Sequence, residues 1–190
     1  MRFIAVPSRV GAILASFGQV YTREMTVTIR PAAATPGDIE SICAIHNQGI
    51  ADRIATLDAI LRAPDDTRAW LGERAPRHPV FVAEVDGTVV GWASLNPFNA
   101  RAAYDNVADF SVYIERGWRG KGIGRQLLDH LIDMARGIGF HKMVLAAMAH
   151  NSAGIALYSR AGFSHVGVYH EQGKLDGRWV DVVIMEKILA

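Results

Sequence analysis

The sequence predicts one mixed α/β domain, and two observations support that prediction. Beyond Met25 the apolar residues recur with a period of two in some segments and of three to four in others, as in alternating strands and helices. The chain of 190 residues, 50% hydrophobic and 21% charged, also has the size and composition of a single domain that buries its own core. We therefore expect no second domain.

The first half of the expected domain contains a strand, two helices and a hairpin. Thr35-Pro36-Gly37-Asp38 combines a helix cap, a proline in the first turn and an acid, which is typical of a helix start. Asp86-Gly87 lies between two apolar runs and favours a tight hairpin turn. The expected elements are a strand at 26–30, a helix at 36–50, a helix opening at 63–66, and hairpin strands at 80–85 and 88–95.

The second half alternates strands with helices after a polar, proline-broken loop at 96–106. Leu127, Leu128 and Leu131 share one face of the first helix of this half. Gly162 suits the left-handed stop of the next helix. The expected elements are a strand at 108–114, a helix at 124–136, a strand at 143–148, a helix at 151–161, and closing strands at 164–170 and 179–189.

Charge and cysteine content exclude several classes of partner and site. A net charge of +1 without a basic run gives no electrostatic footprint for nucleic acid. No apolar stretch reaches the roughly 20 residues that span a bilayer, so we expect no membrane partner. The single Cys43 cannot form an internal disulfide, which fits a reducing, cytoplasmic location. The seven histidines show no metal-binding spacing, so no metal is expected. We interpret residues 1–24 as an N-terminal extension of a domain at 25–190.

A glycine-rich loop is the strongest local signal. Arg119-Gly120-Lys121-Gly122-Ile123-Gly124 stands between an apolar strand and an amphipathic helix, where backbone N–H groups can converge on a phosphate. A dinucleotide fingerprint would need glycine where Arg125 stands, and a P-loop would need Ser or Thr after Lys121. The loop therefore predicts an anion cradle of another kind, with a ligand-free glycine turn as the alternative.

A second motif, 30 residues further on, narrows the assignment. Asn151 caps a predicted helix, and Tyr158 follows two turns later. In this order and spacing, the two motifs resemble the GCN5-related N-acetyltransferase superfamily over Val27–Leu189. The resemblance implies a central mixed, mostly antiparallel sheet flanked by helices, and acetyl-CoA as co-substrate. The coenzyme would contact Val112, Tyr113, Ile114, Arg119, Gly120, Lys121, Gly122, Ile123, Gly124, Arg125 and Asn151.

Further segments resemble one branch of that superfamily. Residues 83–87, 100–105, 108–114 and 176–182 look like those of phosphinothricin N-acetyltransferases, and 47–56 is similar to the arsinothricin-resistance enzymes. The resemblance implies acetylation of the α-amine of a toxic amino-acid-like compound of the phosphinothricin, arsinothricin or methionine sulfoximine type, giving resistance, in a homodimer. Two alternatives remain: an acetyltransferase for another small amine, and a non-catalytic coenzyme-A-binding regulatory module.

Asp109 and Tyr158 are the candidate catalytic residues. An α-amine is protonated near neutral pH, so acyl transfer needs a base and a proton donor for the departing thiolate. Strand alternation places Asp109 on one face with Ser111 and Tyr113. The related family has Glu here, so the shorter Asp could act through a water molecule. Tyr158 could donate the proton, and core packing is the alternative role.

Arg101 is the candidate substrate-binding cation. It lies in the apolar stretch 100–104 and could pair with a carboxylate or a phosphinate-like group, although a surface arginine is equally compatible. Tyr104 and Phe98 could form walls of the same pocket. Apolar residues of the last strand could form a dimer face or ordinary core: Val180, Val182 and Ile184.

Overall fold

The computed structural model describes residues 5–8, 13–16, 19–22 and 25–189, and confirms the predicted mixed α/β class. The strands are β1 (Ala5–Ser8), β2 (Ile13–Ser16), β3 (Gln19–Thr22), β4 (Met25–Pro31), β5 (Val80–Val85), β6 (Thr88–Pro97), β7 (Val107–Ile114), β8 (Lys142–Met148), β9 (Ser164–Leu175) and β10 (Arg178–Ile188). The helices are α1 (Pro36–Asp52), α2 (Pro64–Gly72), α3 (Ile123–Ile138) and α4 (Ser152–Arg160), with 3-10 turns η1 (Ala102–Tyr104) and η2 (Arg116–Trp118).

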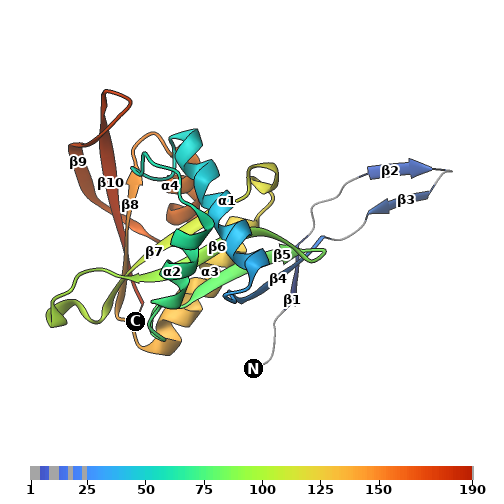
Figure 1. Ribbon diagram of the computed structural model, residues 1–190, viewed down its shortest axis with the longest axis horizontal. Coiled ribbons are helices and arrows are strands. Elements are labelled where there is room, and N and C mark those ends of the chain that lie inside the picture. Colours follow the sequence, from blue (N-terminus) through green and yellow to red (C-terminus); the bar gives the residue numbers. More distant parts are fainter. Residues whose placement is uncertain (1–4, 9–12, 17–18, 23–24, 190) are drawn as a thin grey trace.

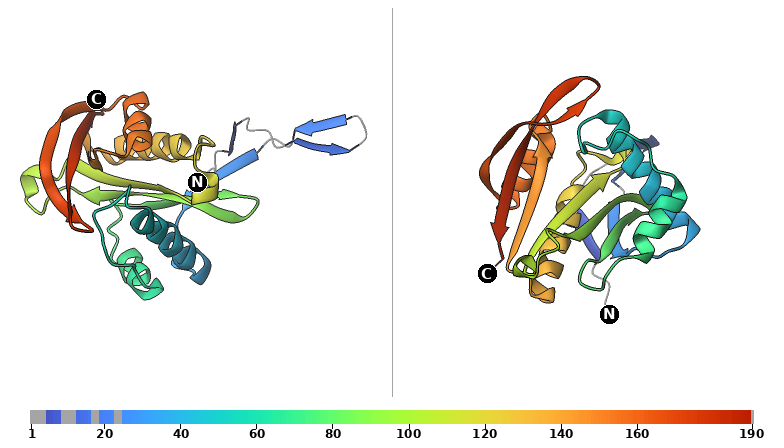
Figure 2. Two further views of the ribbon diagram at one scale, coloured as in Figure 1. Left: turned by 90° about the horizontal axis from the view of Figure 1, so that it is seen from above. Right: turned by 60° about the vertical axis from the view of Figure 1, so that its left-hand side comes forward.

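The elements form a three-layer arrangement around one large sheet (Figure 1). Its strand order is β1-β4-β5-β6-β7-β8-β10-β9, and β2 with β3 forms a separate small sheet. Among the described strands, neighbours are antiparallel except β7 and β8, which run parallel. Helices α1 and α2 cover one face of the large sheet and α3 and α4 the other (Figure 2). The predicted mixed, mostly antiparallel sheet flanked by helices is confirmed.

Most predicted boundaries agree with the structure, and the largest difference lies in β9. The predicted strand ended at His170, but β9 continues to Leu175. Asp176 and Gly177, with φ of 48° and 81°, form a tight turn that keeps β9 paired with β10 as far as Leu175 and Arg178. The length of β9 is therefore set by its pairing with β10, and the local sequence pattern of β9 does not reveal that pairing.

The N-terminal residues bear on the predicted extension without deciding it. β1 pairs antiparallel with β4, from Ala5 opposite Thr28 to Ser8 opposite Met25. The assignment of 1–24 as an extension therefore remains a prediction.

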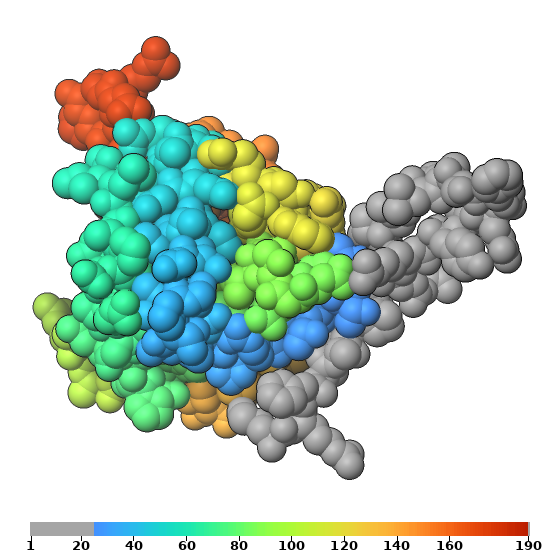
Figure 3. All heavy atoms as spheres, turned by 45° about the vertical axis from the view of Figure 1, so that its right-hand side comes forward, coloured from blue at the N-terminus to red at the C-terminus, as the bar shows by residue number. Residues whose placement is uncertain are grey.

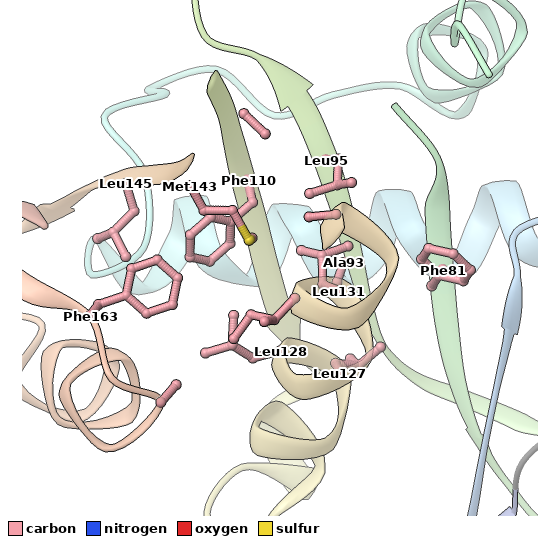
Figure 4. Close-up of a cluster of buried hydrophobic side chains, with 14 of the residues drawn as sticks. Phe81, Ala93, Leu95, Phe110, Leu127, Leu128, Leu131, Met143, Leu145 and Phe163 are labelled. Atoms are coloured by element: carbon pink, nitrogen blue, oxygen red, sulfur yellow. The ribbon is translucent and has the colours of Figure 1, made fainter. Parts of the chain in front are cut away.

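The main core lies between the sheet and α3. Leu127, Leu128 and Leu131 are fully buried on α3, and Phe110 of β7 and Phe163 face the same cluster (Figure 4). A smaller cluster around Trp92 and Val82 fills the space under α1 and α2. Because apolar side chains cover both faces of the sheet, the central strands are held rigidly where they meet the site.

The position of the site follows from how β7 and β8 pair. Val107–Asp109 pairs with Lys142–Val144, and no pairing continues beyond Asp109, although β7 runs to Ile114 and β8 to Met148. The backbone of β7 from Phe110 onward therefore has a free side, and a gap opens between the two strands.

Removing a fully buried α3 side chain should destabilise the protein strongly. Leu128→Ala leaves a cavity in the main core, so the free energy of unfolding should fall by about 2–5 kcal/mol in urea titrations. Met134 is only partly buried on the same helix, and Met134→Ala should cost clearly less. Equal losses in the two variants would contradict this assignment of the core.

Candidate active site

A cavity of about 250 Å³ lies where β7 and β8 part. It brings together five residues predicted from the sequence: Asp109, Val112, Tyr113, Asn151 and Tyr158. The remaining lining residues come from the segment after α1 and from β7, β8 and β10: Ala55, Thr56, Leu57, Phe110, Ser111, Leu145, Ala146, Met148 and Val182.

Asp109 is the last residue of β7 that pairs with β8, where it lies opposite Val144, and on the other side it lies opposite Asn96 of β6. Burial raises the pKa of its carboxyl to about 6, and the hydrogen bond that the Phe110 amide donates to it opposes that shift. A carboxylate with this pKa is ionised at neutral pH and is a stronger base than an exposed aspartate. The position and the pKa both suit proton abstraction.

Tyr158 approaches the same cavity from α4. Its ring packs edge-on against Phe110 at 5.7 Å between centroids, and 6.2 Å from Phe163. Burial raises the pKa of the phenol to about 12, so it keeps its proton at neutral pH. The two roles considered for this residue, core packing and proton donation, are therefore compatible, because the ring packs while the residue lines the cavity.

The backbone of β7 offers hydrogen-bonding groups to the gap. The Glu115 amide donates to the Val90 carbonyl at 2.9 Å, which fixes the alternation of the antiparallel pair. Tyr113, opposite Trp92, therefore directs its backbone groups towards β6, whereas Val112 and Ile114 direct theirs towards the gap. The Ile114 carbonyl already accepts a hydrogen bond from Arg119 Nε at 3.1 Å.

The glycine loop leads directly into α3 and is open above its backbone. Gly120 and Gly122 have φ of 77° and 83°, and a Cβ at either position would meet no heavy atom within 4 Å. Gly122 caps α3 without a side-chain hydrogen bond, so the first amides of this helix remain available to an anion. Gly124 differs, because it is helical and a Cβ there would lie 3.4 Å from Leu157 Cδ2.

The basic side chains of the loop are engaged within the protein. Arg119 Nη1 donates to Asp52 at 2.6 Å, and Arg125 Nη1 donates to the Arg160 carbonyl at 2.8 Å. The Lys121 ammonium lies 4.4 Å from the centroid of the Trp118 ring. These contacts fix the loop, while its backbone amides face open space.

Asn151 links the cavity to α4. Its side-chain oxygen accepts a hydrogen bond from the Gly154 amide at 2.9 Å, which is the predicted N-cap. The capping interaction holds the first turn of α4 at the edge of the cavity.

Two groups of residues at the site were not identified from the sequence: Thr56 with Leu57, and the rings of Trp92 and His46 that contact the predicted Tyr113. Thr56 and Leu57, in the segment after α1, line the cavity opposite α4. Tyr113 stacks on Trp92, with centroids 4.7 Å apart, and lies 5.0 Å from the ring of His46 on α1. No local motif marks these residues, because their meeting depends on how α1 packs on the sheet.

The predicted substrate-binding residues do not reach this cavity within one chain. Arg101 is exposed on the loop between β6 and β7, where Phe98 and Tyr104 pack edge to face at 5.4 Å. None of the three lines the cavity. Their role in substrate binding therefore remains a prediction.

The apolar residues considered for a dimer face have different environments. Val182 is 5% exposed and lines the cavity. Exposed apolar side chains lie instead on β9 and at the start of β10: Val166, Val168, Tyr169 and Trp179.

The described residues offer neither a membrane-spanning helix nor a cluster of metal ligands. None of the helices there is both long and apolar enough to cross a bilayer. The same part of the chain contains no group of three or more His, Cys, Asp or Glu side chains arranged to hold a metal ion.

Comparison with known proteins identifies the fold and the chemistry. The acetyltransferase (GNAT) family model matches residues 48–163. An L-methionine sulfoximine/L-methionine sulfone acetyltransferase of Pseudomonas aeruginosa is 34% identical over 85% of this chain and 94% of its own. A phosphinothricin N-acetyltransferase of Streptomyces coelicolor is 29% identical over 86% of this chain and 96% of its own.

A solved structure agrees with these matches. The GNAT superfamily phosphinothricin acetyltransferase from Sinorhizobium meliloti, in complex with acetyl-CoA, superposes with a TM-score of 0.82. It is 29% identical, over 86% of this chain and 89% of that one. The fold, the glycine loop and these matches together show that the chain belongs to the acetyltransferase (GNAT) family and is an acetyl-CoA-dependent N-acetyltransferase.

Proposed function

We propose that this enzyme transfers the acetyl group of acetyl-CoA to the α-amine of a small, toxic amino-acid-like compound and so gives resistance to it. The candidate substrates are phosphinothricin, arsinothricin and methionine sulfoximine. The observation that carries the proposal is the cavity that joins Asp109 to Tyr158 at the gap between β7 and β8. The names of the relatives from Pseudomonas aeruginosa and Streptomyces coelicolor support this class of acceptor.

Acetyl-CoA supplies an activated thioester, and several features of the chain suit its binding. The open backbone at Gly120 and Gly122 and the first amides of α3 suit the pyrophosphate. The backbone groups of Val112 and Ile114 suit the amides of the pantetheine arm. This arrangement would orient the thioester towards Asp109 and Tyr158.

The two side chains then move protons in opposite directions. Asp109 accepts a proton from the ammonium group of the acceptor, directly or through one water molecule, which frees the nitrogen lone pair. The amine attacks the thioester carbonyl, the C–N bond forms, and the C–S bond breaks. Tyr158 donates its phenolic proton to the departing thiolate, and the second proton that the nitrogen loses as the amide forms returns to the Tyr158 phenolate, directly or through one water molecule.

If the side chain of the acceptor is anionic, it needs cationic partners, and the cavity of one chain lacks them. Among the described residues that line the cavity, none is Arg or Lys. We propose that the enzyme is a homodimer and that Arg101 of a second copy completes the site. The exposed apolar side chains of β9, an edge strand, favour such an assembly. The acceptor could also be neutral, as a sulfoximine or sulfone is.

A panel of amines tests the proposal against its alternatives. Thiol release from acetyl-CoA should be fastest with phosphinothricin, arsinothricin, methionine sulfoximine or methionine sulfone. Faster release with an aminoglycoside, a polyamine or an ordinary amino acid would identify another acceptor. No release with any amine, despite tight acetyl-CoA binding, would favour a regulatory module.

Gly122→Val should weaken acetyl-CoA binding. A β-branched residue is strained at a φ of 83°, and its side chain would fill the space above the loop. Calorimetry should show a Kd raised by about tenfold or more, which corresponds to about 1.4 kcal/mol. Gly137→Val, at the far end of α3 where φ is not positive, is the matched control. Parental affinity in Gly122→Val would exclude the cradle.

The pH dependence of turnover should follow Asp109. Its pKa is about 6 in the free enzyme, so kcat/KM for the amine should fall about tenfold per pH unit below that value and level off above it. Asp109→Asn should lower kcat by about 10² to 10⁴-fold, with acetyl-CoA affinity unchanged. An unaltered pH profile in this variant would exclude Asp109 as the base.

The free energy of unfolding of Asp109→Asn serves as the control for folding and depends on pH in an expected way. Burial raises the carboxyl pKa from 3.8 to about 6, so the folded state binds this proton more tightly than the unfolded chain. The stabilisation is therefore fully present below about pH 4 and is lost as pH rises through about 6. Since Asn never ionises, the variant should be more stable than the parent at pH 8 in urea titrations, with the difference vanishing near pH 4.

Arg101→Ala should discriminate between anionic and neutral acceptors. If Arg101 binds an anionic group in a partly desolvated site, kcat/KM for phosphinothricin should fall by a factor equivalent to about 2–5 kcal/mol. The loss for methionine sulfone should be much smaller. Equal losses would assign Arg101 to the shared carboxylate or to the fold.

Mixing two variants that are each impaired towards phosphinothricin tests whether Arg101 of a second copy completes the site. If Arg101 acts across subunits, exchange between Arg101→Ala and Asp109→Asn should restore roughly a quarter of the parental sites, because half the dimers are mixed and each has one complete site. No recovery after exchange would exclude that arrangement.

A further inference from the structure

Arg53 forms a two-point contact with the turn of the β9–β10 hairpin. Its Nε lies 3.0 Å from Asp176 Oδ2, and its Nη2 lies 3.1 Å from Asp176 Oδ1. The two residues are far apart in the sequence, one directly after α1 and the other between the last two strands. In Figure 3 the red-orange tip of the hairpin adjoins the teal segment that follows α1.

Two further contacts join the same segments. His150 Nε2, in the loop before α4, donates to the Arg53 carbonyl at 2.8 Å. Leu57 lies against Gly173 of β9, so closely that a Cβ on that glycine would be 2.9 Å from Leu57 Cδ1. Arg53 therefore contacts the loop before α4 and the hairpin, and the segment that follows it covers part of the hairpin.

The segment held in this way forms part of the cavity wall. Ala55, Thr56 and Leu57, which begin two residues after Arg53, line the same cavity as Tyr158. Arg53 itself ends α1 in the left-handed conformation, with φ of 56°, which is unfavourable for a residue with a side chain. Asp176 is fixed by its turn, with φ of 48°. The ion pair thus joins the left-handed end of α1 to the tight turn between β9 and β10.

We propose that Arg53 and Asp176 form a clasp that holds residues 53–57 closed over the cavity and so positions the acceptor amine. Arg53 is a positioning residue, because its guanidinium contacts Asp176 and, through Nη1 at 3.5 Å, the Asp58 carbonyl, and because residues that follow it touch the cavity. The identity of the acceptor that is positioned rests on the proposed function. The closure of residues 53–57 by the ion pair does not depend on that function.

The size and salt dependence of the effect follow from exposure. The Arg53 and Asp176 side chains are 35% and 65% exposed, so water and salt weaken their attraction. Breaking the pair should therefore raise the open population of the segment by roughly 2- to 5-fold, without unfolding the protein. Because the open form is the minor one, the KM for the amine should rise only by the factor by which the closed fraction falls, which is smaller, with kcat and the Kd for acetyl-CoA close to parental.

A double-mutant cycle tests the clasp with two readouts. Arg53→Ala, Asp176→Ala and the double variant are compared with Arg68→Ala, which breaks a separate exposed pair with Asp65 on α2. The first readout is the rate of chymotrypsin cleavage within residues 54–61, located by mass spectrometry without any substrate. It follows the open population when opening is fast relative to cleavage. The second is KM for methionine sulfone and for phosphinothricin.

The clasp predicts that each single variant raises cleavage by roughly 2- to 5-fold and amine KM by a smaller factor, and that the double variant adds nothing further. Raising the salt concentration should have the same effect on the parent and little on the variants. Arg68→Ala should behave as the parent in both readouts.

Other outcomes would overturn the proposal. A parental cleavage rate in Asp176→Ala, or multiplying effects in the double variant, would exclude the clasp. A raised KM in Arg53→Ala alone would mean that Arg53 binds the acceptor directly. If the parent acetylates none of the amines, the proposed function fails, and the cleavage cycle still decides whether the clasp holds the segment.

Discussion

The parting of β7 from β8 after Asp109 is the constraint on which the rest of the site depends. The two strands are parallel, with different neighbours on their outer sides: β6 antiparallel to β7, and β10 antiparallel to β8. Their pairing ends after three residue pairs, so the backbone of β7 has unpaired groups in the middle of a sheet. Such groups are costly when buried unless a ligand or water bonds them. A gap of this kind is suited to an extended ligand with amide groups.

The site combines features that are unfavourable for the folded state alone. Asp109 is buried enough to raise its pKa to about 6, and Gly120 and Gly122 hold conformations that other residues rarely adopt. The core beneath α3 supports these features, since Leu127, Leu128 and Leu131 are fully buried. Because α3 is well packed, the uncapped amides of its first turn keep a fixed direction. A less rigid segment would allow these amides to reorient.

The side of the cavity proposed for the acceptor is built differently from the side proposed for the coenzyme. On the proposed coenzyme side, the glycine loop and α3 are consecutive in the chain, so one local sequence specifies them. The proposed acceptor side joins the segment after α1, the loop before α4 and the β9–β10 turn, through Arg53, His150 and Asp176. Its shape depends on contacts between distant segments, and small changes in those contacts can alter the size of the acceptor without disturbing the coenzyme.

The sequence by itself determined the elements and the local chemistry of the coenzyme side. Thr35 and Asn151 cap helices as predicted, Asp86-Gly87 forms the hairpin turn, and Gly122 starts α3. These features depend on side chains within a few residues, so a local pattern contains them. The same reasoning placed Asp109 on one face of β7 with Ser111 and Tyr113, all of which line the cavity, because strand alternation is local.

Only the tertiary structure decided which distant segments meet at the site. It placed Thr56 and Leu57 against the cavity, stacked Trp92 on Tyr113, and left Arg101 outside the cavity of its own chain. The apolar stretch around Arg101 suggested a pocket, but in the structure Arg101 and its neighbours on this loop are exposed. Contacts of this kind arise from the packing of α1 and of the β9–β10 hairpin on the sheet, and no spacing in the sequence contains that geometry.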